Sequence, residues 1–291
     1  MFFKAQGIIT ALVTPFDREE RLDGKKLRTA VEFQLKAGVD GIFVCGSTGE
    51  AYSLEFEEKR ELLEITVDAV QGRVPVYMGC GGSTTRQAVM LVEMAEKVGA
   101  NAISIITPYF LTPNQEELYL FYKDTASSTS LPIIMYNHPI RTSVRILPET
   151  VEKLALIPNI IGIKDSSSDL NNNMAYVKAG GKEFCVLSGN DSMILSLLNL
   201  GGRGAVSASA NFVPKLVCDL YREYCTGNRE KAVELQYKLF QVRRVFNMGS
   251  YPVMIKEACK IMGIDVGECR KPVLGLNNED YRKLKDILES L

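Results

Sequence analysis

A lysine and a tyrosine stand at the ends of two short apolar stretches. Lys164 follows the run 160–163 (IIGI), and Tyr136 lies near the end of the run 132–137 (PIIMYN). Removing an amine from water favours its neutral form, which is the form that attacks a carbonyl to make an imine. A nearby phenol can move protons during imine formation. The catalytic interpretation is therefore a Schiff base between Lys164 and the carbonyl group of a substrate.

Both residues also have a structural interpretation. Lys164 is followed by Asp165 and can be read as half of an ion pair at a strand edge. Tyr136 can be read as an amphipathic side chain that closes the core with its hydroxyl in water. Position along the chain leaves the two interpretations of Lys164 equally favoured.

Three further segments carry groups suited to a small anionic substrate. The turn 46–50 (GSTGE) offers backbone N–H groups and hydroxyls, which suits a carboxylate or phosphate, although a plain strand-to-helix turn also needs glycine. Arg141 can pair with a second substrate anion or lie at the surface. Gly189 and Asn190 follow another apolar run and are expected to contact the substrate. His138, the only histidine, is interpreted as a loop residue near the substrate and not as a metal ligand.

The elements that would position these residues alternate regularly. Short β-branched runs are separated by longer amphipathic stretches such as 54–70 and 85–99, as βαβ units require. The runs are apolar throughout, which indicates a parallel sheet covered by helices on both faces. We predict eight strands, at 7–16, 41–45, 75–80, 102–108, 132–137, 160–165, 184–190 and 203–209.

Eight such units without a reversal favour a closed α/β (β/α)₈ barrel, a TIM barrel, over a doubly wound sheet. After the last strand the pattern is wholly helical, with helices expected at 213–225, 229–247, 251–262 and 278–290. We therefore predict a barrel over residues 1–225 and a C-terminal helical region over 226–291. In such barrels the functional groups lie at the carboxyl ends of the strands.

Composition excludes several classes of function. The formal net charge is −1, so no basic surface field is available to hold nucleic acid. No stretch approaches the ~20 apolar residues of a membrane span, and the first residues are interrupted by threonine and proline, unlike a signal peptide. The number of cysteines, seven, is odd, and no two of them form a CxxC motif. This pattern is typical of reduced thiols. We expect a cytoplasmic protein that binds neither nucleic acid nor membrane and contains no metal.

Five motifs occur together in order: GSTGE (46–50), YNHPIRT (136–142), GIKD (162–165), LSGND (187–191) and GAVSASAN (204–211). With these motifs the chain resembles the dihydrodipicolinate synthase / N-acetylneuraminate lyase family over nearly its whole length. The resemblance implies a TIM barrel with a C-terminal helical part and a homotetramer built as a dimer of dimers. It strongly favours Lys164 as the Schiff-base residue.

The resemblance also implies roles for other residues. Tyr136 matches the family's catalytic tyrosine, and Val206 matches a residue near bound pyruvate. Ser47 and Thr48 match a pair whose backbone N–H groups bind the keto-acid carboxylate, with one hydroxyl, assigned to Ser47, relaying protons. The expected substrates are a 2-oxo acid and an aldehyde. No cofactor is implied, because the protonated imine at Lys164 serves as the electron sink.

The aldehyde is harder to predict. Arg141 matches the arginine that holds the carboxylate of aspartate semialdehyde in the synthases. Phe110, however, stands where synthases usually carry a tyrosine that reaches into the neighbouring subunit's proton relay. The leading interpretation is a synthase-like enzyme that condenses pyruvate with aspartate semialdehyde. A 2-keto-3-deoxy sugar-acid or N-acetylneuraminate-type aldolase or dehydratase and a non-catalytic keto-acid-binding barrel remain as alternatives.

Feedback regulation can also be predicted from the resemblance. Synthases inhibited by lysine usually have a small polar pocket at the dimer contact. At matching positions this chain has Phe56, Lys59, Ser83 and Gln87, in place of an expected histidine, asparagine and acid. We predict no inhibition by lysine.

Overall fold

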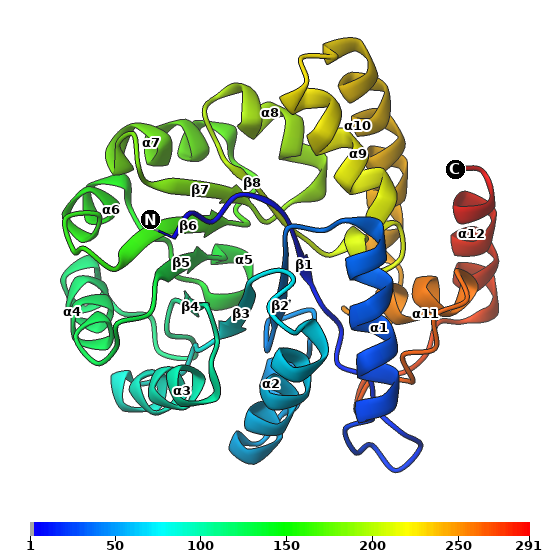
Figure 1. Cartoon of the computed structure of the whole chain (residues 1–291), viewed down its shortest axis with the longest axis horizontal. Coiled ribbons are helices and arrows are strands. Elements are labelled where there is room, and N and C mark those ends of the chain that lie inside the picture. The colour runs from blue at the N-terminus through cyan, green and yellow to red at the C-terminus, as the bar shows by residue number, and fades with distance from the viewer. Residues whose placement is uncertain (1–2) are drawn as a thin grey trace.

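The strands are short and strongly apolar, and they close on one another. The structure is a computed structural model and describes residues 3–291. All neighbouring strands are parallel and form a closed barrel in chain order (Figure 1). The strands are β1 (Gly7–Ala11), β2 (Gly41–Val44), β3 (Val76–Gly79), β4 (Ala102–Ile106), β5 (Ile133–Asn137), β6 (Ile160–Asp165), β7 (Cys185–Ser188) and β8 (Gly204–Ser207). The predicted TIM barrel and its eight strands are confirmed.

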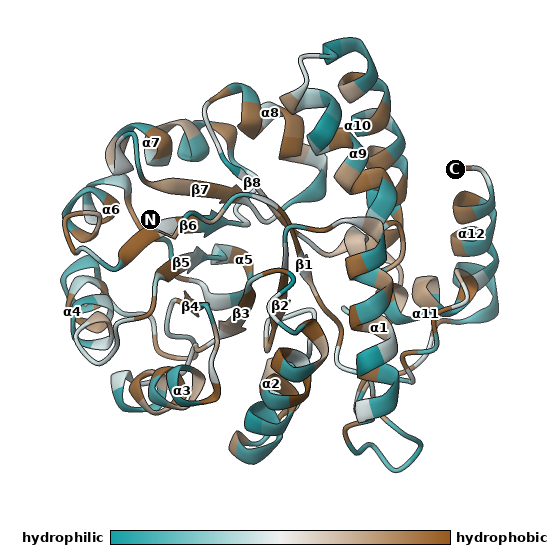
Figure 2. Ribbon diagram, in the orientation of Figure 1, coloured by the Kyte–Doolittle hydropathy of each residue, from teal (hydrophilic) through white to brown (hydrophobic). Residues whose placement is uncertain are grey.

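The core has two layers because every strand is buried on both faces. Alternate side chains such as Ile9, Phe43, Ile134, Leu187 and Val206 form a cluster of their own inside the barrel. The side chains between them pack outward against the helices in a larger cluster. Figure 2 shows hydrophobic strands such as β1 and β7 within a ring of helices that carry both hydrophobic and hydrophilic residues.

Helices surround the barrel, and local signals set where several of them begin. The N-cap side chain of Asn114 accepts hydrogen bonds from the backbone N–H groups of Glu116 and Glu117 at the start of α4, and the backbone N–H of Asn114 donates to the Glu117 carboxylate. The helices up to the end of the barrel are α1 (Gly24–Ala37), α2 (Phe56–Val70), α3 (Thr85–Val98), α4 (Gln115–Ala126), α5 (Pro139–Thr142), α6 (Pro148–Leu154), α7 (Leu170–Gly180), α8 (Ile194–Asn199) and α9 (Pro214–Cys225).

Three more helices follow, α10 (Arg229–Arg243), α11 (Val253–Ile261) and α12 (Asn278–Glu289). They lie together on one side of the barrel, and α10 packs against α9 (Figure 1). The helix expected over 229–247 ends at residue 243 and continues as the 3₁₀ turn η4 (Arg244–Asn247). The other short 3₁₀ turns are η1 (Ala51–Ser53), η2 (Asp191–Met193) and η3 (Ser209–Asn211).

The first strand is shorter than the sequence suggested. The run 7–16 was expected to be extended throughout, but β1 ends at Ala11. Beyond it the hydroxyl of Thr14 donates to the backbone oxygen of Gly49 at 2.6 Å. The segment after β1 is therefore used to hold the turn that follows β2.

Candidate active site at the carboxyl end of the barrel

Lys164 lies inside the barrel near the end of β6. Only 6% of the residue is exposed. Its Nζ lies 3.9 Å from the centroid of the Tyr136 ring and 5.4 Å from that of the Phe43 ring. Tyr136 is the residue paired with Lys164 in the register of β5 with β6. The lysine and tyrosine singled out in the sequence are therefore neighbours.

The ion-pair interpretation of Lys164 is wrong. Successive side chains in a strand point to opposite faces, so Asp165 faces the helices while Lys164 faces the interior. The Asp165 carboxylate accepts hydrogen bonds from Asn137 at 2.7 Å, Ser167 at 2.6 Å and Asn173 at 2.9 Å. Within residues 3–291, Lys164 takes part in no salt bridge.

Burial also changes the protonation of Lys164. The loss of water around the ammonium group lowers the pKa of Lys164 to about 7, and the negative charge of Asp191 opposes this shift only in part. A substantial fraction of the amine is then neutral near neutral pH. This is the state required for attack on a carbonyl.

Tyr136 is buried beside Lys164, with 5% of the residue exposed. Burial raises the pKa of the Tyr136 phenol, and interactions with the hydroxyls of Ser166 and Ser47 oppose that shift. The phenol therefore keeps its proton at neutral pH. It is a suitable proton donor to an oxygen that leaves the neighbouring carbon.

The turn 46–50, which contains Ser47 and Thr48, is anchored by contacts of the Glu50 carboxylate with the C-terminal region. Glu50 adopts a left-handed backbone conformation with φ 54°. Its carboxylate forms a fully buried ion pair with Lys256 of α11 at 2.7 Å and accepts the backbone N–H of Arg270 at 3.0 Å. In residues 3–291, neither Ser47 nor Thr48 donates its backbone N–H to another residue. Two N–H groups are thus free for an anion.

One cavity of about 580 Å³ gathers all the site residues predicted from the sequence. It opens at the carboxyl ends of the strands, where a TIM barrel binds its ligands. The predicted residues that line it are Ser47, Thr48, Tyr136, Arg141, Lys164, Gly189, Asn190 and Val206.

Two of these residues have a clear steric or hydrogen-bonding role. A Cβ atom on Gly189 would lie 1.9 Å from Ser166 Oγ and 3.0 Å from Lys164 Cε, so a side chain there would invade the space of the lysine. The Asn190 side chain donates to the Ser168 hydroxyl at 2.7 Å and accepts from Arg243 Nε at 3.3 Å. Val206, on β8, contributes an apolar side chain to the wall of the cavity.

Sequence reasoning missed the residues that enter the cavity from the C-terminal region. Arg243, Phe246, Asn247 and Tyr251 all line it. They lie beyond the last strand, where neither strand ends nor hydrophobic periodicity marks a functional position. No signal in the single sequence places them beside Lys164.

His138 lies closer to the reacting groups than the sequence indicated. It lines the cavity, its ring centroid is 5.7 Å from that of Tyr136, and its Nδ1 has no hydrogen-bond partner in residues 3–291. Burial and then the positive charge of Lys164 lower the pKa of His138 to about 3. The imidazole is therefore neutral and can exchange a hydrogen bond with a substrate.

The chain is similar to known proteins over nearly its whole length. Residues 4–291 match the model of the dihydrodipicolinate synthetase family. The chain is 40% identical to a 4-hydroxy-tetrahydrodipicolinate synthase of Thermodesulfovibrio yellowstonii, over 98% of both chains. The chain belongs to the dihydrodipicolinate synthetase family. Its relatives named in this way are enzymes, and the chain is accordingly a lyase of this family.

Solved structures of the dihydrodipicolinate synthetase family have the same fold. The dihydrodipicolinate synthase of Aquifex aeolicus matches with a TM-score of 0.95 and 36% identity over 98% of each chain. YagE, a prophage protein of E. coli K12 assigned to the dihydrodipicolinic acid synthase family and solved in complex with pyruvate, matches with a TM-score of 0.95 and 32% identity over 98% of each chain.

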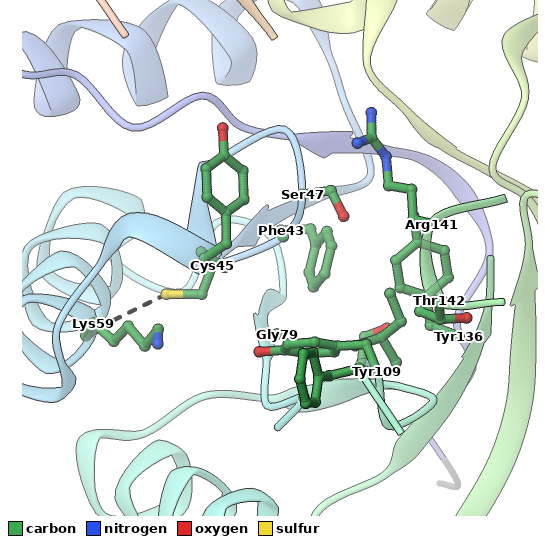
Figure 3. Close-up of a pocket in the computed structure, with 16 residues that line it drawn as sticks. Phe43, Cys45, Ser47, Lys59, Gly79, Tyr109, Tyr136, Arg141 and Thr142 are labelled. Atoms are coloured by element: carbon green, nitrogen blue, oxygen red, sulfur yellow. Dashed lines mark hydrogen bonds between the residues drawn. The ribbon is translucent and has the colours of Figure 1, made fainter. Parts of the chain in front are cut away.

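This family member also has a second cavity beside the first, of about 360 Å³. Figure 3 shows Ser47, Tyr136 and Arg141 among the residues around it, and these three residues line both cavities. Lys59 and Tyr109 are among the other residues that line this smaller cavity, and Lys164 does not line it.

Phe110 stands on the rim of the smaller cavity and projects into solvent. Its side chain is 94% exposed, and the next residue, Leu111, is 76% exposed. The backbone of Phe110 is left-handed, with φ 79°. Phe110 and Leu111 thus form a pair of adjacent exposed apolar side chains.

In the segment 3–291, no group of three or more His, Cys, Asp and Glu side chains is arranged to hold a metal ion. None of the helices there combines the length and the apolar character needed to cross a bilayer.

Proposed function

We propose that the enzyme condenses pyruvate with aspartate semialdehyde to 4-hydroxy-tetrahydrodipicolinate through an imine at Lys164. The observation that carries this proposal is the buried amine of Lys164, with its pKa lowered to about 7, facing Tyr136 in the large cavity. The name shared by the curated relatives supports the choice of substrates.

The first half of the reaction forms the imine. The free N–H groups of Ser47 and Thr48 bind the pyruvate carboxylate. The neutral amine of Lys164 then attacks the C2 carbonyl carbon, and one proton moves from the newly bonded nitrogen to the carbonyl oxygen, which becomes a hydroxyl. A second proton, supplied through Tyr136, converts that hydroxyl to water, which leaves as the iminium forms. Ser47, which lines the same cavity as Tyr136, returns a proton to the phenol.

The second half forms the new carbon–carbon bond. The iminium withdraws electrons, so a C3 proton is lost and an enamine results, without a metal or an organic cofactor. The enamine carbon attacks the aldehyde carbon, and the aldehyde oxygen gains a proton. The amine of the semialdehyde then adds to C2 and displaces Lys164, which closes the ring and restores the free enzyme. Arg141 holds the carboxylate of the semialdehyde during these steps.

A turnover assay tests the proposal. The enzyme supplied with pyruvate and aspartate semialdehyde is expected to consume both at equal rates. Lys164→Ala should abolish the reaction, whereas Lys59→Ala, which removes the amine of the neighbouring cavity, should retain turnover. Loss of turnover only in the Lys59 variant would contradict the assignment.

A second candidate, a 2-keto-3-deoxy sugar-acid or N-acetylneuraminate-type aldolase or dehydratase, is favoured by further polar side chains in the wall of the large cavity. His138, Arg243 and Asn247 line it there and offer hydrogen bonds to a polyhydroxylated chain. The same Lys164 imine would form in either reaction. Turnover of keto-deoxy sugar acids with no turnover of aspartate semialdehyde would establish this candidate.

We also propose that the protein acts in the cytoplasm as a homotetramer. The exposed apolar pair of Phe110 and Leu111, beside a cavity that shares residues with the active site, supports contact with another copy of the chain. Light scattering should give the mass of four chains. A monomer at micromolar concentration would contradict the proposed assembly.

A further inference from the structure

Tyr251 connects two parts of the active site that lie far apart in the sequence. It precedes α11 in the C-terminal region, and its half-buried side chain lines the large cavity with Lys164. The Tyr251 hydroxyl lies 2.6 Å from Thr48 Oγ1. Thr48 itself is 4% exposed, so this hydrogen bond fixes a hydroxyl that has few other positions open to it.

The ring of Tyr251 has a separate contact. The guanidinium carbon of Arg141 lies 4.6 Å from the ring centroid, a distance at which a cation is attracted to the aromatic face. Arg141 forms no salt bridge with any side chain of residues 3–291. Stacking on Tyr251 thus restrains the guanidinium while its N–H groups stay available for an anion.

The backbone on both sides of this contact is anchored. Lys256, one turn into α11, forms the buried ion pair with Glu50, two residues after Thr48. Lys256 also donates to the backbone oxygen of Glu268 at 2.7 Å. The turn after β2 and the start of α11 are therefore held to each other independently of Tyr251. A change of the tyrosine should alter its two contacts without separating these segments.

We propose that Tyr251 is a positioning residue that sets both substrate-binding groups at once. Its hydroxyl orients Thr48 at the carboxylate of the 2-oxo acid, and its ring orients Arg141 at the anionic group of the aldehyde. The inference rests on the proposed function and adds a residue of the C-terminal region to it. It also implies that the enzyme prefers an aldehyde with an anionic group over a neutral one.

Two substitutions separate the two contacts. Tyr251→Phe removes the hydroxyl but keeps the ring, so the KM for pyruvate should rise about fivefold while the KM for aspartate semialdehyde is little changed. Tyr251→Leu removes the ring as well, and both KM values should rise. Tyr237→Phe on α10, where the side chain is 68% exposed, is the matched control and should change neither.

A double-mutant cycle checks that the hydroxyl acts through Thr48. The effects of Tyr251→Phe and Thr48→Val on pyruvate half-saturation should be smaller together than the sum of the two single effects, because the two residues share one hydrogen bond. Borohydride trapping of the imine at saturating pyruvate should still succeed in the Phe and Leu variants.

The outcomes distinguish this inference from the proposed function. If the unmodified enzyme gives no pyruvate adduct with borohydride, the proposed function fails. If the adduct forms but Tyr251→Phe leaves pyruvate half-saturation unchanged, or Tyr251→Leu affects the two substrates no more than Tyr251→Phe, the role of Tyr251 is overturned. A fall in kcat with both KM values unchanged would also overturn it.

Discussion

At the scale of single residues, the decisive feature is the orientation of Lys164. Its position along the chain left its two interpretations equally favoured, and only the resemblance to a known family favoured the Schiff base, although strand alternation already separates Lys164 from Asp165. The structure excludes the ion pair, because the Asp165 carboxylate accepts hydrogen bonds from Asn137, Ser167 and Asn173 on the outer face. Residues at strand ends were predictable from the motifs, whereas the contact of Tyr251 with Thr48, across 203 positions, left no local pattern to read.

The lowered pKa of Lys164 predicts a pH dependence of imine formation. A depressed pKa means that the neutral amine becomes populated as pH rises through about 7, instead of near the ordinary lysine value. The initial rate of imine trapping with pyruvate should therefore increase from about pH 6 to about pH 8 and then level off. Rates that continue to climb to about pH 10 would show that the amine is not desolvated.

At the scale of elements, strand positions were predicted well because each strand is a distinct apolar run between turns. The contacts between the ends of different elements were less predictable. The carboxyl end of β7 must approach β6 so closely that Gly189 leaves no room for a Cβ beside Ser166 and Lys164. The turn after β2 likewise depends on α11, through the ion pair of Glu50 with Lys256.

The close approach of β7 to β6 predicts that adding a single methyl group at position 189 lowers both stability and imine formation. Gly189→Ala should displace Ser166 or the stem of Lys164, and it should lower the free energy of unfolding by about 1–3 kcal/mol and reduce imine formation strongly. Gly275→Ala is the matched control, because a Cβ there meets no atom within 4 Å. Thermal unfolding and borohydride trapping measure the two effects. Equal behaviour of the two variants would refute this account of Gly189.

The ion pair between Glu50 and Lys256 predicts an asymmetric response to substitution. Lys256→Met leaves the carboxylate of Glu50 buried without its partner and should destabilise the fold by about 3–5 kcal/mol. Adding Glu50→Gln should recover part of that loss, since no unpaired charge then remains. Denaturant unfolding of the single and double variants measures this. A double variant no more stable than Lys256→Met would contradict the explanation.

At the scale of the whole molecule, composition and the order of strands and helices were sufficient to predict the barrel. The boundary between residues 225 and 226 stays a prediction. The C-terminal region was expected to be an appendage, yet it supplies Arg243, Phe246, Asn247 and Tyr251 to the cavity. This region therefore forms part of the wall of the candidate active site, which follows from tertiary packing that a single sequence does not encode locally.

The smaller cavity beside the active site predicts how the whole enzyme responds to lysine. Lys59 lines this cavity and brings a positive charge to it. Free lysine carries a like charge at its side chain and would be repelled. Millimolar lysine should leave the initial rate of condensation unchanged, and Lys59→Glu should permit weak inhibition. Strong inhibition of the unmodified enzyme would contradict this prediction.

The central claim is that Lys164 forms a covalent imine with a 2-oxo acid. Borohydride reduction in the presence of pyruvate, followed by peptide mass mapping, tests it most directly. We expect one reduced pyruvyl group per chain, located on Lys164, and none on the Lys164→Ala variant. Failure to find an adduct, or an adduct on a different lysine such as Lys59, would contradict the claim.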